Sequence, residues 1–121
     1  VEMFNISTAR LAETRAFFIE VLGLEEGWRP PLSFAGAWLY AGGRDVVHLA
    51  ERAETPRASA GSALDHFAFS IDDYEAAVGR LQAAGVAFRE LEAPAGGIRQ
   101  LFVTELNGVT IELNCRAPAR P

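Results

Sequence analysis

The order of predicted elements is the same in both halves of this 121-residue chain, and this repetition limits the possible folds most strongly. Each half opens with a strand of alternating apolar residues, MFNIST in the first and HFAFSI in the second, and continues with an amphipathic helix. Aligning the halves pairs Met3 with His66 and His48 with Glu112, at an offset of 62 to 64 residues throughout. Chance similarity between two α+β halves is the alternative. The near-constant offset favours two copies of a β-α-β-β-β module.

The boundaries of the elements follow from turn and capping residues. The first helix is predicted from Leu11 to Leu22, and the second within DDYEAAVGRLQAAG, each ending at a glycine. Strands AWLYA and VVHLA are joined by the tight turn GGRD, and strand VAFREL precedes a hairpin whose turn contains Asn107 and Gly108. We predict a single domain over residues 1–121, with module one at about 1–52, a linker at about 53–62 and module two at about 63–115.

Composition narrows the possible partners. The net charge is −5 and the 11 basic residues are scattered arginines, so no basic stripe exists to neutralise nucleic acid. No apolar run approaches the ~20 residues of a membrane span. The single cysteine, Cys115, excludes an internal disulfide and fits a reducing compartment. We expect a cytoplasmic protein whose partner is a small molecule, with neither nucleic acid nor a membrane involved.

Three side chains of metal-binding type fall on one kind of surface. Because successive strand residues point to opposite faces, the apolar neighbours of His48, His66 and Glu112 pack on the helices and these three face away. Strict alternation directs Asp65 to the face opposite His66. If the two sheets curve toward one another, the two imidazoles and the carboxylate form a site for a divalent transition metal. The alternative is a pair of hydrogen-bonded structural histidines and a solvated glutamate.

Several motifs resemble those of a known superfamily. TRAFFIEVLGLEEGW, WLYAGG with VVHLAE, LDHFAFSIDD and NGVTIELN are similar to segments of the vicinal oxygen chelate superfamily, which includes glyoxalase I, fosfomycin-resistance and bleomycin-resistance proteins and extradiol dioxygenases. The resemblance implies an α+β fold of two modules. It also implies a cup-shaped, partly open mixed β-sheet barrel with the helices outside, usually in a homodimer.

The resemblance also implies a ligand set. Superfamily ligands come from the first and last strands of each module, which correspond here to Met3, His48, His66 and Glu112. Met3 stands where the superfamily usually has histidine or glutamine, and a thioether suits copper(I) better than zinc, iron or manganese. A divalent metal (Zn, Fe, Mn or Ni) is therefore expected to be held by three protein ligands, or to be absent.

Other side chains are expected near the same site. Alternation places five of them on the faces away from the helices: Asn5, Trp38, Tyr40, Gln100 and Phe102. Arg29 is the only charge in the loop GWRPPLSFAG and could bind a substrate carboxylate through two hydrogen bonds. The alternative is that Trp38 and Phe102 are packing or dimer-interface residues and that Arg29 is solvated.

The resemblance implies a glyoxalase-like metal-dependent enzyme that chelates vicinal oxygens of a small substrate, as an isomerase, lyase or dioxygenase. In such an enzyme Glu112 could be both a metal ligand and the catalytic base. The alternative is a metal-free protein of the bleomycin-resistance type that binds and sequesters a small molecule.

Overall fold

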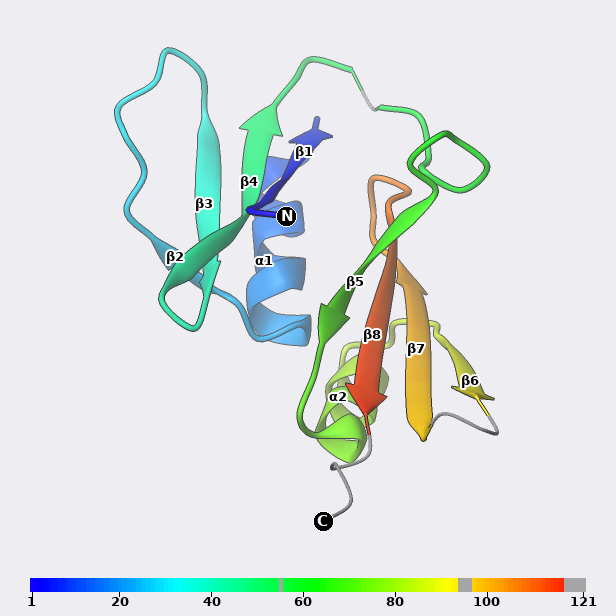
Figure 1. Cartoon of the computed structure of the whole chain (residues 1–121). Coiled ribbons are helices and arrows are strands. Elements are labelled where there is room, and N and C mark those ends of the chain that lie inside the picture. Colours follow the sequence, from blue (N-terminus) through cyan, green and yellow to red (C-terminus); the bar gives the residue numbers. More distant parts are fainter. Residues whose placement is uncertain (55, 94–96, 117–121) are drawn as a thin grey trace. The chain divides into compact units, whose positions relative to one another are not determined.

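The chain folds as two compact units, Val1–Arg57 and the part that begins at Ala58. The computed structural model describes residues 1–54, 56–93 and 97–116. Within these residues each unit contains one four-stranded mixed sheet and one helical segment (Figure 1). The α+β class and the tandem β-α-β-β-β modules are thereby confirmed. No helix among the described residues is long and apolar enough to cross a membrane.

The first unit contains strands and a helix in the order of a β-α-β-β-β module, with the helix in two segments. Its elements are β1 (Phe4–Thr8), α1 (Leu11–Ala16), η1 (Phe17–Val21), β2 (Glu25–Gly27), β3 (Gly36–Ala41) and β4 (Arg44–Glu51). Its sheet has the order β1-β4-β3-β2, with β1 parallel to β4 and the other pairs antiparallel. The turn between β3 and β4 uses Gly42 and Gly43 at φ 59° and 79°, values that favour glycine and suit a two-residue hairpin.

The second unit has the same topology. Its sheet has the order β5-β8-β7-β6, and β5 runs parallel to β8. Its elements are β5 (His66–Ser70), α2 (Tyr74–Ala83), β6 (Arg89–Ala93), β7 (Ile98–Thr104) and β8 (Thr110–Arg116). Asn5 pairs with His48 in the first sheet and Ala68 with Glu112 in the second, which keeps the predicted offset between modules. Strand register and sequence repeat therefore agree.

The first helical segment differs from the prediction in its final turn. The chain is helical from Leu11 as expected, but Phe17–Val21 forms a π-helix, in which the Leu22 amide donates to the Phe17 carbonyl at 3.3 Å. Phe18, inside this wider turn, is completely buried. The predicted helix is therefore present, with one local widening where its largest core residue packs.

Two strands differ from their predicted positions. The sequence predicts no strand at Glu25–Gly27, because GLEEG contains the glycine that ends the first helix and shows no apolar alternation. The structure forms β2 there through pairing with β3. In the second unit the predicted strand VAFREL begins later, at Arg89. Both differences concern edge strands, where burial constrains the sequence pattern least.

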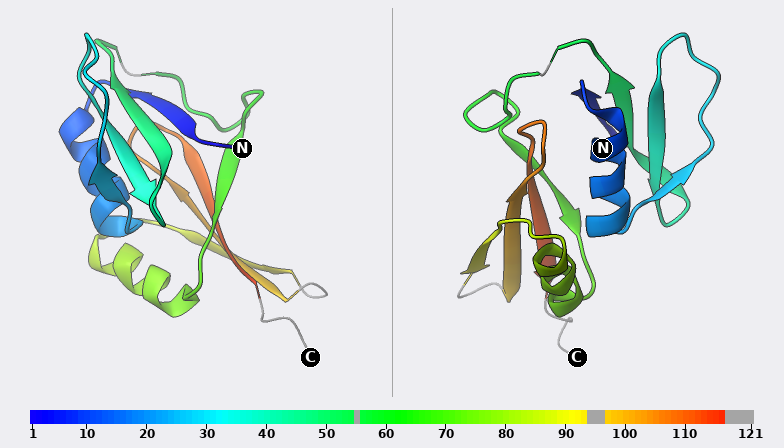
Figure 2. Two further views of the ribbon diagram at one scale, coloured as in Figure 1. Left: turned by 60° about the vertical axis from the view of Figure 1, so that its left-hand side comes forward. Right: turned by 180° about the vertical axis from the view of Figure 1, so that it is seen from behind.

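Each sheet buries one face under its helical segment (Figure 2). In the first unit the fully or almost fully buried residues include Phe18, Leu39, Val47 and Leu49; in the second they include Leu81, Leu101, Val103 and Ile111. Those that lie in strands alternate with the partly exposed residues of the opposite face, whereas Phe18 and Leu81 belong to the helical segments. The apolar helix-facing side thus fixes which side chains remain available for chemistry.

Polar contacts attach α2 to its sheet. Asp73 caps the helix by accepting a hydrogen bond from the Ala76 amide at 3.0 Å. The Tyr74 hydroxyl donates to Glu90 of β6 at 2.7 Å, and the Arg99 guanidinium lies 3.7 Å from the centroid of the Tyr74 ring. Burial, followed by the contact with Glu90, raises the pKa of Tyr74 to about 12.

Replacing a buried leucine of the second sheet should destabilise the protein far more than replacing an exposed one. Leu101→Ala should lower the free energy of unfolding by about 2–5 kcal/mol, because it removes a fully buried side chain and leaves a cavity. Leu91→Ala on the neighbouring strand is the control, since Leu91 is 53% exposed. Urea denaturation measures both, and equal losses would contradict the proposed packing.

The unfolding free energy should fall as pH rises from about 10 to about 12. The folded chain keeps the Tyr74 proton until its raised pKa of about 12, whereas the unfolded chain loses it near the ordinary value of 10.0. Ionisation therefore favours the unfolded state in this window. Denaturant unfolding at several pH values should show a steeper loss in the wild type than in Tyr74→Phe. Equal slopes would show that Tyr74 keeps an ordinary pKa.

Candidate functional site

His48 lies in a stacked and hydrogen-bonded position on β4. Its ring is 3.8 Å from the Trp38 ring of β3, at an interplanar angle of 8°. Its Nε2 is 2.5 Å from Oδ2 of Asp45, three residues earlier on the same strand. A register shift in the β3–β4 ladder, between Leu39 and Tyr40, accompanies this contact, since regular alternation would place i and i+3 on opposite faces. The hydrogen bond to His48 lowers the pKa of Asp45.

Aromatic side chains extend this surface over the edge strand. The Trp28 ring meets Trp38 edge to face at 5.9 Å. The Tyr40 hydroxyl donates to the Trp28 carbonyl at 2.7 Å, and the Tyr40 ring covers Gly27 so closely that a Cβ there would lie 2.7 Å from it. Tyr40 therefore stabilises β2. The sequence of β2 alone does not indicate a strand. Asn5 pairs with His48 and is exposed.

Arg29 is held within its own loop. Its Nη2 donates to the Phe34 carbonyl at 2.8 Å, and its guanidinium lies 5.2 Å from the Phe34 ring centroid. Its Nε is buried and has no hydrogen-bond partner among the residues that the structure describes. The contacts of Arg29 with Phe34 stabilise the loop after Trp28. The role of Arg29 in binding a substrate carboxylate stays a prediction.

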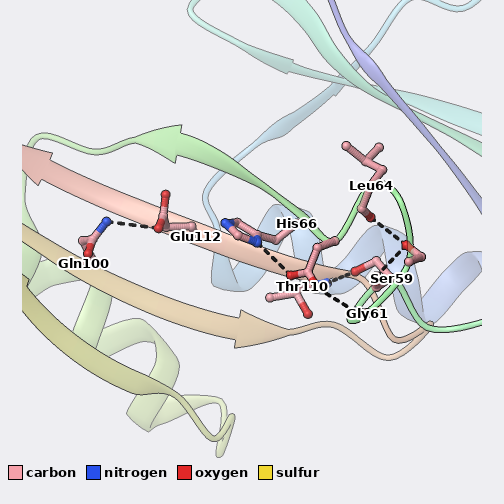
Figure 3. Close-up of polar contacts among 9 residues, drawn as sticks. Ser59, Gly61, Leu64, His66, Gln100, Thr110 and Glu112 are labelled. Atoms are coloured by element: carbon pink, nitrogen blue, oxygen red, sulfur yellow. Dashed lines mark hydrogen bonds and ion pairs between the residues drawn. The ribbon is translucent and has the colours of Figure 1, made fainter.

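The second unit presents His66 and Glu112 on one face of its sheet (Figure 3). His66 pairs with Thr110, and Glu112 is two residues further along β8. Glu112 Oε1 accepts from Gln100 Nε2 at 3.0 Å, and its Oε2 accepts from Asn114 Nδ2 at 2.9 Å. Gln100 also donates to Asn114 Oδ1 at 3.3 Å. Two amides therefore orient the carboxylate, and each of its oxygens retains a lone pair for a further partner.

Asp65 orients the imidazole of His66. Its Oδ1 is 2.9 Å from His66 Nδ1, and its Oδ2 accepts from the Gly61 amide at 2.6 Å. The Gly61 amide, and then His66, lower the pKa of Asp65. The expectation that Asp65 faces away from His66 is wrong, because β5 begins at His66 and strand alternation does not extend to the preceding residue. With Nδ1 on Asp65, Nε2 is the nitrogen that could bind a metal.

Part of the predicted linker is attached to β8. The Thr110 amide donates to Ser59 Oγ at 2.8 Å, and the Ser59 amide donates to the Gly108 carbonyl at 2.9 Å. Gly108 has φ 86°, and a Cβ there would approach the Ala58 Cβ to 2.8 Å. Gly61, the donor to Asp65, is thus carried by an anchored segment. Neither Ser59 nor the alanines on either side of it predict this contact in the sequence.

Each unit gathers part of the predicted set. Within the first unit the sheet ladder aligns Asn5, His48 and Trp38, with Tyr40 beside them. Within the second it aligns His66, Gln100, Phe102 and Glu112 on one face. In the described part of the chain, neither unit alone holds a group of three or more His, Cys, Asp or Glu residues suited to a metal. The three-ligand set takes His48 from one unit and two ligands from the other, and it stays a prediction.

The chain belongs to the Glyoxalase/Bleomycin resistance protein/Dioxygenase superfamily, whose family model matches residues 1–113. No curated protein sequence matches it.

Solved structures share the fold at low sequence identity. A glyoxylase/bleomycin resistance protein/dioxygenase domain from Frankia sp. EAN1pec is 20% identical, with a TM-score of 0.81 and 99% and 93% of the two chains covered. The fosfomycin resistance protein FosX from Listeria monocytogenes is 18% identical, with a TM-score of 0.77 and coverages of 97% and 93%. A FosX mutant in complex with Mn(II) and 1S,2S-dihydroxypropylphosphonic acid is 17% identical, with a TM-score of 0.78 and coverages of 97% and 92%.

The two histidines should have opposite tautomers when neutral. Asp65 contacts Nδ1 of His66, whereas Asp45 contacts Nε2 of His48. Each carboxylate favours the proton on the nitrogen that it contacts. Long-range ¹H–¹⁵N correlation NMR of the metal-free chain, with both imidazoles neutral, should show Nδ1–H for His66 and Nε2–H for His48.

Asp65→Ala provides the control for the tautomer measurement. It should move the proton of His66 to Nε2 and leave His48 unchanged. Identical tautomers in the wild type would contradict the hydrogen-bonding roles of the two aspartates.

Proposed function

We propose that this protein is a metal-dependent enzyme of the glyoxalase type, with His48, His66 and Glu112 as the ligands of one divalent metal ion. The observation that carries the proposal is the arrangement in the second unit. Two amides orient the Glu112 carboxylate, and on the same sheet face Asp65 binds Nδ1 of His66 and leaves Nε2 for a ligand. Hydrogen bonds of this kind orient metal ligands in protein sites.

The chemistry of the donor set fits a divalent metal. Two imidazoles and a carboxylate suit Zn, Fe, Mn or Ni and leave positions for substrate. The Mn(II) complex of FosX, a structural neighbour, supports use of such an ion in this superfamily. Met3 precedes β1 and offers only a thioether, so the proposed site uses three protein ligands.

A bound divalent metal would supply Lewis acidity to two adjacent oxygens of a small substrate, in an isomerase, lyase or dioxygenase reaction. The chain itself holds the Glu112 carboxylate through Gln100 and Asn114. We assign Glu112 the additional role of accepting a substrate proton, as the catalytic base. Trp38 and Phe102 would contact the apolar part of the substrate.

The polar side chains proposed to bind substrate are Asn5, Arg29, Tyr40 and Gln100. Tyr40 and Arg29 also hold their own loop, through the Trp28 and Phe34 carbonyls. Their contribution would therefore include shaping the loop as well as contacting the ligand.

Binding of a small molecule without metal is the second candidate function. Nε2 of His48 already contacts Asp45, and its ring is stacked on Trp38, as a structural histidine would be. Met3 in place of a stronger ligand favours the same interpretation. The exposed Trp28 and the adjoining Trp38 would then bind an aromatic or apolar compound and sequester it.

We also propose that the protein acts as a homodimer in the cytoplasm. The dimer rests on the resemblance to the superfamily, and the compartment rests on the single cysteine.

Metal content should separate the two functions. Elemental analysis of the dialysed chain, after separate incubation with iron(II), manganese, nickel and zinc, should find about one metal per chain with at least one of these ions. His66→Ala and Glu112→Ala should lose it, because each removes a proposed ligand. Gln100→Leu should weaken binding by about 10–100-fold, since it removes a hydrogen bond that orients Glu112.

Glu75→Ala is the matched control, because Glu75 is an exposed carboxylate on α2. It should bind metal as the wild type does. A wild-type chain that retains none of the four ions would overturn the enzymatic proposal and favour metal-free binding.

A further inference from the structure

The open face of the second sheet contains a cavity of about 520 Å³, which is lined in part by Asp65, Phe102 and Thr110 of the candidate site. Phe88, Arg89 and Phe102 line it together with Thr104 and Thr110. Its volume lies in the range of small-molecule sites, and all of its lining residues belong to the second unit. Its apolar lining consists of the aromatic rings of Phe88 and Phe102 together with Ala60, Val86 and Ala87, and Arg89 is the only basic side chain among the described lining residues.

Arg89 holds its charge above an aromatic ring. It pairs with Phe102 across the β6–β7 ladder, and its guanidinium carbon lies 4.8 Å from the centroid of the Phe102 ring. Within the described residues it has no ion pair and no hydrogen-bond acceptor. A guanidinium offers five donors in a planar fork that matches a carboxylate. Arg89 is therefore positioned to receive an anion.

The nearby carboxylates are committed to other partners. Asp65, which also lines the cavity, already accepts from the Gly61 amide and contacts His66. Glu90, next to Arg89 in sequence, accepts from Tyr74 on the helix side of the sheet. Neither carboxylate is paired with Arg89, so the positive charge of Arg89 remains available to a ligand.

We propose that Arg89 and Phe102 form a subsite for a small aromatic carboxylate, with Arg89 binding the carboxylate and Phe102 contacting the ring. This inference rests on the proposed function, because it names the substrate class for that site. His66 lies edge to face with Phe102 at 6.1 Å, so a ring held there lies next to the proposed metal ligand. The subsite would select planar acids over their neutral analogues.

Benzoate and benzamide test the proposal, because they share shape and differ in charge. The 121-residue chain is treated with a chelator and titrated with each compound, and amide shifts of Thr104 and Thr110 are followed by NMR. Benzoate should bind at least tenfold more tightly than benzamide. Arg89→Gln should remove this preference, and Arg89→Lys should keep part of it, since lysine retains the charge without the planar fork.

Two further variants complete the design. Phe102→Leu should weaken both compounds, because it removes the shared ring contact. Arg80→Gln, an exposed arginine on α2, should change neither. Equal wild-type affinities, an unchanged preference in Arg89→Gln, or shifts confined to residues outside the cavity would each overturn the subsite. Because the protein is free of metal in this titration, the result is independent of whether His48, His66 and Glu112 bind an ion.

Discussion

The two-residue alternation of side chains along the sheets is the constraint on which the rest of this structure depends. Leu49 and Ile111 are almost completely buried on the helix-facing sides, and a shift of register by one residue would expose them. The same constraint keeps His48 and Glu112 on the opposite faces. Stability and chemistry are therefore coupled, because the apolar residues that bury one face determine which side chains remain on the other.

Much of the fold could be predicted because these strands obey a simple period. The large apolar residues of β5 and β8 alternate with small or polar ones, and the offset between modules located equivalent strands. β2 could not be predicted in this way. It is three residues long and exposed, and it depends on pairing with β3 and on the Tyr40 ring above Gly27. Contacts between segments form this strand, and its own sequence does not indicate it.

The contacts around the candidate ligands show the same limit. Alternation identified the faces of His66, Gln100 and Glu112, but not the acids that orient the histidines. Asp65 precedes its strand, so the period does not apply to it. Asp45 reaches His48 at a place where the ladder changes register. Both contacts depend on irregular backbone, which a periodic sequence pattern does not predict.

Divergence between the two modules has given equivalent positions different chemistry. His48 pairs with Trp38 across its ladder, and the two rings stack, which leaves a rigid aromatic surface. In the second unit Glu112 pairs with Phe102 in the same way, but its oxygens are held by amides instead. The Phe102 ring is then free to contact Arg89. In one copy of the module an imidazole is thus stacked on an aromatic ring. In the other copy a carboxylate lies at the equivalent position, beside an aromatic ring that contacts an arginine. The two copies therefore present different charges at equivalent positions of the same fold.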